Sequence, residues 1–309
     1  MEAVNIQLFG NDPKVTKAVS IAKNVSVTKA PVLISGEVGI GKKTLGHFIH
    51  QNSKRCNGPV EIVDCSMDPQ KVEDQILGYR DDTGKFNKGV LELANGGSVI
   101  MANIDGVEEN FQKRLHTVLT ELDDYDIDVR IITTTTKNLS KLVGSGRFYR
   151  GLYVYLSVNN ITLPPLRERT SDLEMLAKYF IANYNSETEL VFDSNAINKI
   201  LSHYWTHNVH ELKAVIENSI ENSENGILNE KDLAIGEKRA VSIINDDDNE
   251  GIRLMSLKDA EKLLIKKALI HTSENRTQAA KILGVSIRTL RNKINEYRNG
   301  GNSYFVNLR

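Results

Sequence analysis

The 309-residue sequence is poor in cysteine and has no long apolar segment. Its two cysteines, Cys56 and Cys65, cannot form a disulfide framework, and no residues near them have the spacing of zinc ligands, so we expect two reduced thiols. No stretch approaches the roughly 18 apolar residues of a membrane-spanning helix, and the first residues lack the basic and apolar regions of a signal peptide. These absences predict a cytoplasmic protein without a membrane partner.

The chain as a whole has little net charge, but that charge is unevenly distributed. It has 39 basic and 40 acidic residues, a net charge of −1. From Ser256 to Arg309 there are eleven basic and four acidic residues, a net charge of +7, which leaves −8 on the first 255 residues. A basic segment is the electrostatic signature of a nucleic-acid contact. We therefore expect DNA binding in the tail and not in the remainder.

Short β-branched runs alternate with helical patterns over about the first 165 residues. These runs are PVLIS at 31, VEIVD at 60, SVIM at 98, VRIITTTT at 129 and NNITL at 159. This alternation predicts an α/β fold with a mostly parallel sheet. From Ser171 to about Leu233 the strand signals stop and amphipathic helical patterns follow, which predicts a small helical domain.

A glycine-rich turn lies between the first predicted strand and a helical stretch. In that position, backbone N–H groups and one lysine can hold nucleotide phosphates. We assign Lys42 as the phosphate lysine; the Ser or Thr that usually follows it and holds magnesium is replaced by Lys43. A glycine-rich turn without a ligand is the alternative interpretation. The expected nucleotide-binding residues are Gly36, Glu37, Val38, Gly39, Ile40, Gly41, Lys42 and Lys43.

A series of motifs then identifies a family. The segments GEVGIGKKTLGHFIH, GVLELANGGSVIM, ITLPPLRERTSDLEMLA and WTHNVHELKAVIE follow one another in order. Over about residues 5–235 the chain resembles the AAA+ central domain of bacterial sigma-54-dependent enhancer-binding activators, the NtrC family. The closing segment, SLKDAEKLLIKKALIHTSENRTQAAKILGVSIRTLRNKINEY, resembles the Fis-type helix-turn-helix that ends those proteins.

The resemblance implies an α/β AAA+ P-loop core with a parallel sheet, a small helical lid and a C-terminal all-α helix-turn-helix domain. It also implies ATP as the ligand and a subunit ring as the assembly. No sensory input domain is visible before the core. The boundaries we expect are core 1–168, lid 169–236, acidic linker 237–255, helix-turn-helix 256–300 and tail 301–309.

Two segments depart from active family members, which use a GAFTGA loop to contact the sigma factor. The corresponding interval here, YRDDTGKFNK, is shorter and lacks that motif. Ala102 and Asn103 follow the strand SVIM where the family has the acid pair that positions magnesium and the attacking water, and Asp105 is out of register. The missing loop argues against a sigma-54 contact, and the missing acids argue against a bound Mg²⁺ and against hydrolysis.

Other catalytic positions of the family are also replaced. Tyr149 and Tyr155 stand where it has trans-acting arginines, and Arg150 is displaced by one residue. His210 replaces an arginine of the lid helix, and Asp64 replaces an Asn at the end of the second strand. Together these losses predict a pseudo-ATPase that binds ATP without hydrolysing it. The alternative is that the glycine-rich turn is an inherited structural feature that binds no ligand.

The tail has the pattern of a helix-turn-helix. The first helix packs through Ala279, Ala280 and Leu283, the turn comes at Gly284, and one or more of Ile287, Leu290 and Ile294 pack inward from the second helix. A solvated basic helix is the alternative. The preceding helix, Leu257 to His271, is expected to form a dimer. The expected DNA-binding residues are Thr277, Ser286, Arg288, Thr289, Arg291, Asn292 and Lys293, with Lys293 and Thr277 meeting phosphates.

These observations predict a bacterial sequence-specific DNA-binding transcriptional regulator that acts on double-stranded DNA and forms a homo-oligomer. When bound to DNA it would lie at the nucleoid. Two other hypotheses stay open. One is a working ATPase with rearranged catalytic groups that activates sigma-54 RNA polymerase. The other is a modulator that co-assembles with an intact paralogue.

Overall fold

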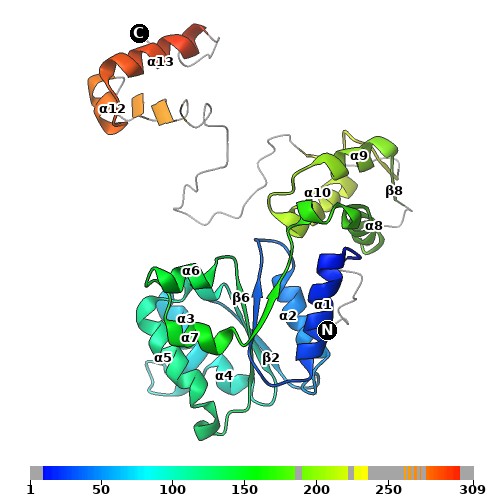
Figure 1. Ribbon diagram of the computed structural model, residues 1–309, viewed down its shortest axis with the longest axis vertical. Helices are drawn as coiled ribbons and strands as arrows, with labels where there is room; N and C mark the ends of the chain where they lie inside the picture. Colours follow the sequence, from blue (N-terminus) through cyan, green and yellow to red (C-terminus); the bar gives the residue numbers. More distant parts are fainter. Residues whose placement is uncertain are drawn as a thin grey trace. The chain divides into compact units, whose positions relative to one another are not determined.

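The computed structural model describes residues 10–184, 190–221, 226–235, 261, 264–265, 268–269, 272 and 276–299. They fall into two compact units, one within residues 1–239 and one within residues 240–309 (Figure 1). The expected acidic linker, 237–255, and the expected tail, 301–309, lie outside the described residues. Among the helices that are described, none is long and apolar enough to cross a membrane.

A five-stranded parallel sheet forms the centre of the first unit. Its strands are β1 (Val32–Ser35), β2 (Val60–Asp64), β5 (Ser98–Ala102), β6 (Arg130–Thr135) and β7 (Asn159–Thr162), in the order β2-β5-β6-β1-β7. Each strand coincides with one of the β-branched runs, so the predicted α/β fold with a parallel sheet is confirmed.

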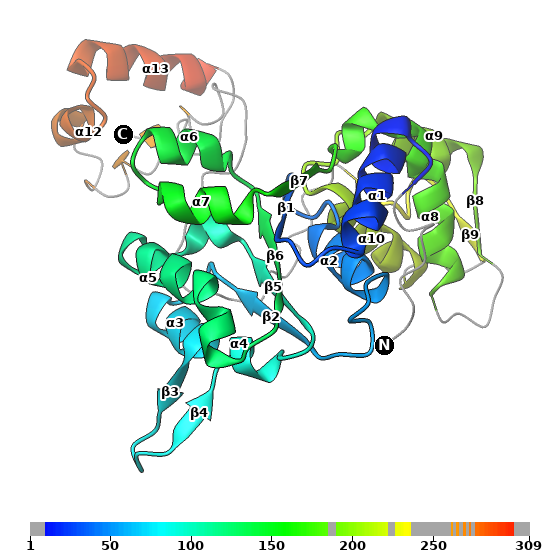
Figure 2. The same cartoon turned by 60° about the horizontal axis from the view of Figure 1, so that its bottom comes forward.

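Helices cover both faces of this sheet (Figure 2). Alternate residues of a strand point to opposite faces. Ile100 accordingly packs with α1 and α2, whereas its neighbours Val99 and Met101 pack with the helices of the other face. Helices therefore exclude water from both faces, which agrees with the burial of every residue of β5. The helices are α1 (Pro13–Ser26), α2 (Lys42–Gln51), α3 (Pro69–Leu77), α4 (Val90–Leu93), α5 (Glu109–Thr120), α6 (Leu139–Gly144) and α7 (Arg150–Leu156).

A short antiparallel hairpin, β3 (Gly78–Arg80) and β4 (Phe86–Lys88), extends from the sheet domain between α3 and α4 (Figure 2). Its turn is closed by Asp81, whose Oδ1 accepts hydrogen bonds from the backbone N–H groups of Thr83 and Lys85 at 3.0 Å each. This hairpin is the conformation of most of the interval YRDDTGKFNK.

The lid packs three helices around one tryptophan. The helices are α8 (Leu173–Ala182), α9 (Ser194–Ser202) and α10 (Asn208–Glu221), with a parallel pair of short strands, β8 (Val191–Phe192) and β9 (Ile227–Leu228). Trp205 has no exposed surface, and its indole N–H donates to the carbonyl of Ile200 at 2.9 Å. The lid thus has a core of its own.

In the second unit, α12 (Arg276–Ile282) and α13 (Ile287–Asn299) form the helix pair expected of a helix-turn-helix. Gly284, in the turn, has a φ of 67°, a left-handed conformation that glycine adopts without strain. Leu290 and Ile294 are buried, and Ile287 is 39% exposed. The core is Ile265, Ala268, Leu269, Ala279, Ala280, Leu290, Ile294 and Tyr297.

Candidate functional site

The glycine-rich turn leaves a row of backbone donors at the N-terminus of α2. Gly39 and Gly41 have φ values of 71° and 103°, and a Cβ on Gly41 would meet no atom within 4 Å, so the space over the turn is open. Within the described part of the chain, no carbonyl or side chain accepts a hydrogen bond from the N–H groups of residues 38–43. Unpaired N–H groups at a helix N-terminus favour an anion. The turn therefore fits nucleotide phosphates.

Lys42 lies beneath this turn. Its ammonium donates to the carbonyl of Gly36 at 2.9 Å and to that of Glu37 at 2.7 Å, and the residue is only 8% exposed. Burial lowers its pKa to about 8. The charges of Asp105 and Glu37 oppose that shift, whereas the charge of Lys43 adds to it.

The lid braces the turn through Glu37. The guanidinium of Arg167 donates to both carboxylate oxygens of Glu37, at 2.7 and 2.5 Å, and this pairing lowers the pKa of Glu37. The amide of Asn208 donates to Glu37 at 3.2 Å and to the carbonyl of Val38 at 2.9 Å, while its oxygen accepts from the N–H of Leu166 at 2.7 Å. One asparagine thus ties the turn to the lid.

The first turn of α10 also approaches the glycine-rich turn directly. The backbone N–H of His210 donates to the carbonyl of Gly39 at 3.1 Å. A Cβ on Gly39 would lie 2.1 Å from the carbonyl oxygen of His207, so only glycine fits there. Sequence reasoning missed the role of Asn208. Asn208 begins α10 with a φ of 54°, a left-handed conformation in which asparagine is enriched, but no sequence pattern indicated its contacts.

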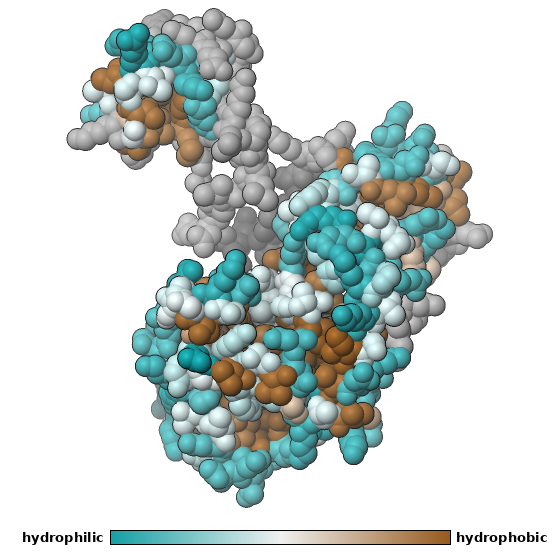
Figure 3. Space-filling model, viewed as in Figure 1, coloured by the Kyte–Doolittle hydropathy of each residue, from teal (hydrophilic) through white to brown (hydrophobic). Residues whose placement is uncertain are grey.

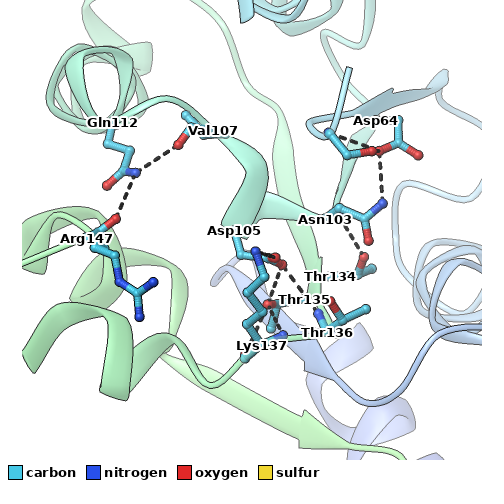
Figure 4. Close-up of polar contacts among 11 residues, drawn as sticks. Asp64, Asn103, Asp105, Val107, Gln112, Thr134, Thr135, Thr136, Lys137 and Arg147 are labelled. Carbon is cyan, nitrogen blue, oxygen red and sulfur yellow. Dashed lines mark hydrogen bonds and ion pairs between the residues drawn. The ribbon is translucent and has the colours of Figure 1, made fainter. Parts of the chain in front are cut away.

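At the ends of β2 and β5, an amide and a carboxylate face each other (Figure 4). The Nδ2 of Asn103 donates to Oδ1 of Asp64 at 2.9 Å, and its backbone N–H donates to the Thr134 hydroxyl at 3.2 Å. Ser66 also donates to Oδ1, and Lys43 lies 3.2 Å from Oδ2. Burial would raise the pKa of Asp64, but these donors together hold it at about 2.

Asp105 points away from this pair, toward the segment after β6 (Figure 4). It accepts a hydrogen bond from the Thr135 hydroxyl at 2.7 Å and forms an ion pair with Lys137 at 3.3 Å. Its side chain is 6% exposed. Asp105 is therefore already engaged by other groups and does not replace an acid at the end of β5.

The residues near the turn do not fit a magnesium ion. Mg²⁺ at a phosphate loop is held by a hydroxyl after the phosphate lysine and by an acid at the end of the neighbouring strand. Lys43 and Ala102 stand in those places. Within the described residues, no three His, Cys, Asp or Glu side chains are grouped so as to hold a metal.

Tyr149 and Tyr155, which the resemblance implies stand at the positions of arginines, contact a histidine of α5. Their rings meet that of His116 edge-on, at centroid distances of 5.5 and 6.3 Å. Tyr149 and Arg150 also line a cleft of about 660 Å³ between α5 and the segment before α7. The two positions at which arginines were expected, 149 and 155, are tyrosines, so neither places a cation at this cleft.

In the second unit, most of the expected DNA-binding residues are exposed. Arg288, Thr289, Arg291 and Asn292 are on the exposed part of α13, and Thr277 is exposed on α12. Ser286 begins α13, because its hydroxyl accepts from the N–H of Thr289 at 3.0 Å. It is thus a helix cap as well as a candidate contact.

Lys293, which was expected to meet a DNA phosphate, is paired with a carboxylate of its own domain. Its ammonium lies 3.0 Å from the carboxylate of Glu261, which also accepts a hydrogen bond from the Tyr297 hydroxyl at 2.9 Å. Lys293 precedes the buried Ile294 and lies one helical turn before Tyr297, so it stands at the edge of the packed face of α13.

Three family models match the chain. Residues 8–162 match the model described as "Sigma-54 interaction domain", residues 167–240 match "AAA+ ATPase lid domain", and residues 256–297 match "Bacterial regulatory protein, Fis family".

Individual proteins of this kind are similar along nearly the whole chain. The transcriptional regulatory protein FlbD of Caulobacter vibrioides is 29% identical over 94% of this chain and 70% of its own length. The PTS-dependent dihydroxyacetone kinase operon regulatory protein of Escherichia coli is 32% identical over 93% and 47%. The structure of NtrX from Brucella abortus in complex with ADP covers 96% of this chain and 69% of its own, at 21% identity and a TM-score of 0.66, which shows a shared fold.

Proposed function

The chain belongs to the family of bacterial regulators built on a sigma-54 interaction domain, and from this premise we propose that it is a sequence-specific DNA-binding transcriptional regulator whose AAA+ domain binds ATP without hydrolysing it. Its lid and Fis-type helix-turn-helix complete the domain set of the sigma-54-dependent transcriptional regulators. The proposal assigns ATP to the core (1–168) and lid (169–236) and DNA to residues 256–300.

Nucleotide binding is supported by the open turn of residues 36–43, with its unpaired N–H groups and the Lys42 ammonium. A bound nucleotide supplies a phosphate chain to those donors, and Lys42 would pair with it. Contacts of Asn208 in the lid and of Arg167 in the segment before the lid hold the turn in shape. Nucleotide would then add to the stability of the first unit according to its concentration and affinity.

The loss of hydrolysis rests chiefly on the end of β5. Ala102 has no carboxylate, and Asn103 donates its amide to Asp64 and carries no base. Phosphoryl transfer without metal positioning, a water-orienting group or an arginine in trans loses most of its electrostatic catalysis. The proposal therefore treats the bound nucleotide as a structural or signalling ligand.

The hairpin β3–β4 supports regulation without the usual loop contact to sigma-54. It joins its two strands through a five-residue turn, Asp81 to Lys85, that the carboxylate of Asp81 closes. This interval, YRDDTGKFNK, is too short to form a long mobile loop. The proposal therefore includes no contact of such a loop with the sigma factor.

DNA binding is assigned to α13 in the major groove, with Arg288, Arg291 and Asn292 at base edges. Self-association is supported by apolar side chains exposed on this unit. Leu264, Ile282 and Val285 are 57%, 59% and 41% exposed, and Figure 3 shows apolar surface beside hydrophilic surface here. We assign a dimer to this domain and a ring to the AAA+ domain.

The test is ATP turnover by the purified full chain at saturating ATP and Mg²⁺, with nucleotide and DNA binding measured in parallel and Lys42→Ala as the control. The proposal expects nucleotide and DNA binding without turnover above the control. Turnover of about one per second, the low end of ordinary enzyme rates, that is lost in Lys42→Ala would overturn it and favour the working-ATPase hypothesis.

A further inference from the structure

A lysine ammonium stands where a phosphate loop ordinarily places the ligand of a metal ion. Lys43 directly follows the phosphate lysine, in the first turn of α2. Its Nζ lies 3.2 Å from Oδ2 of Asp64, at the end of β2. The side chain is 51% exposed, so a ligand at the turn can reach it.

Asp64 holds this ammonium in a defined place. Its Oδ1 already accepts hydrogen bonds from the Ser66 hydroxyl at 2.6 Å and from the Asn103 amide at 2.9 Å. Those bonds orient the carboxylate, so that Oδ2 points to Lys43. Among the described residues, Asp64 is the partner of the Lys43 ammonium, which leaves two of its three N–H donors for other acceptors.

The position of this charge relative to Lys42 also matters. The two residues are adjacent at the start of α2, and the charge of Lys43 lowers the pKa of Lys42. Two nearby cations are stabilised by an anion that contacts both. A phosphate chain over the turn is such an anion, and a second cation brought with it would meet the charge of Lys43.

From these contacts we infer that Lys43, held by Asp64, is a built-in cation that replaces Mg²⁺, so that the site takes a metal-free nucleoside di- or triphosphate. This rests on the proposed nucleotide binding and deepens it. Lys43 would donate to phosphate oxygens that Mg²⁺ contacts in other phosphate loops. Asp64 acts as a positioning residue and touches no phosphate.

The test measures the dissociation constant of fluorescent ADP for the full chain, in excess EDTA and in excess Mg²⁺. The wild-type chain is expected to bind at least as tightly in EDTA. Lys43→Met, which keeps the chain length and removes the charge, should weaken binding in EDTA by about tenfold, the loss of a charge-assisted hydrogen bond. Lys43→Arg should retain most of the affinity in EDTA.

The matched control is Lys29→Met, which removes an ammonium that is likewise paired with an aspartate, Asp128, at 3.3 Å on the surface. It should leave the dissociation constant unchanged, and thermal melting should show that all variants fold. Binding by the wild-type chain that is at least tenfold tighter in Mg²⁺ than in EDTA would overturn the inference while nucleotide binding stands. Absence of binding in both buffers would overturn both, with DNA binding tested separately.

Discussion

The side-chain amide of Asn103 donates a 2.9 Å hydrogen bond to the carboxylate of Asp64, across the neighbouring ends of β5 and β2. In the family that the sequence resembles, the acid is expected after β5 and the amide after β2. The same two kinds of group therefore meet here with their positions exchanged. The carboxylate of Asp64 places a negative charge next to Lys43.

Asp64 should contribute to stability at neutral pH and lose that contribution in acid. Its pKa falls from 3.8 to about 2 on folding, so the contribution is present above about pH 4 and disappears as the pH falls toward 2. The shift corresponds to about 2 kcal/mol, which solvent screening reduces to about 1 kcal/mol. Urea unfolding at pH 5 and pH 3 should show a smaller pH effect for Asp64→Asn than for the wild-type chain. Asp124→Asn, at an exposed position, is the control; equal pH effects in all three would contradict the assignment.

Nucleotide affinity should fall as the pH rises above about 8. Lys42 has a pKa of about 8, and only its ammonium form attracts a phosphate, so phosphate binding raises that pKa and takes up protons. The affinity should decrease by up to about tenfold per pH unit above 8. Titration calorimetry at pH 8.5 in two buffers of different ionisation enthalpy measures the protons taken up. A constant affinity from pH 7 to 9.5 would show that Lys42 does not contact the phosphates.

The contact between Arg167 and Glu37 should stabilise the docking of the lid. Arg167→Ala removes both charge-assisted hydrogen bonds and should lower the free energy of unfolding of the first unit measurably. Lys14→Ala removes an exposed, single ion pair to Glu168 and should lower the free energy of unfolding less than Arg167→Ala does. Denaturant unfolding of the full chain, followed by the fluorescence of Trp205, measures both. Equal effects would mean that the Arg167 pair acts as an ordinary surface pair.

Arg291 and Lys293 should contribute differently to DNA binding. Arg291→Ala removes an exposed side chain assigned to a base edge and should cost about 1–3 kcal/mol on the preferred duplex. Lys293→Ala should mainly reduce the stability of the second unit, because the ammonium pairs with Glu261. Fluorescence anisotropy with a selected and a random duplex, over a series of salt concentrations, separates the two roles. If Lys293→Ala reduces the salt dependence of DNA affinity by the amount that corresponds to about one phosphate contact, Lys293 contacts the DNA backbone.

Much of the fold and part of the site follow from local patterns. The β-branched runs predicted all five strands of the sheet, and the glycines between β1 and α2 predicted the turn with its N–H groups. In the helix-turn-helix, periodicity predicted that one or more of Ile287, Leu290 and Ile294 would pack inward, and Leu290 and Ile294 are buried. Such features depend on residues close in sequence, so their spacing is sufficient to predict them.

The remaining features depend on residues that are far apart in the chain. No pattern indicated that Asn208 would bridge Glu37 and the segment at Leu166, or that Lys43 would meet Asp64 across the end of the sheet. The helical pattern predicted that Lys293 would meet a phosphate, whereas its ammonium pairs with Glu261. These contacts were decided by tertiary structure, because sheet order and lid docking determine which distant side chains meet. The sequence by itself determined the layers, the turn and the absence of an acid at Ala102.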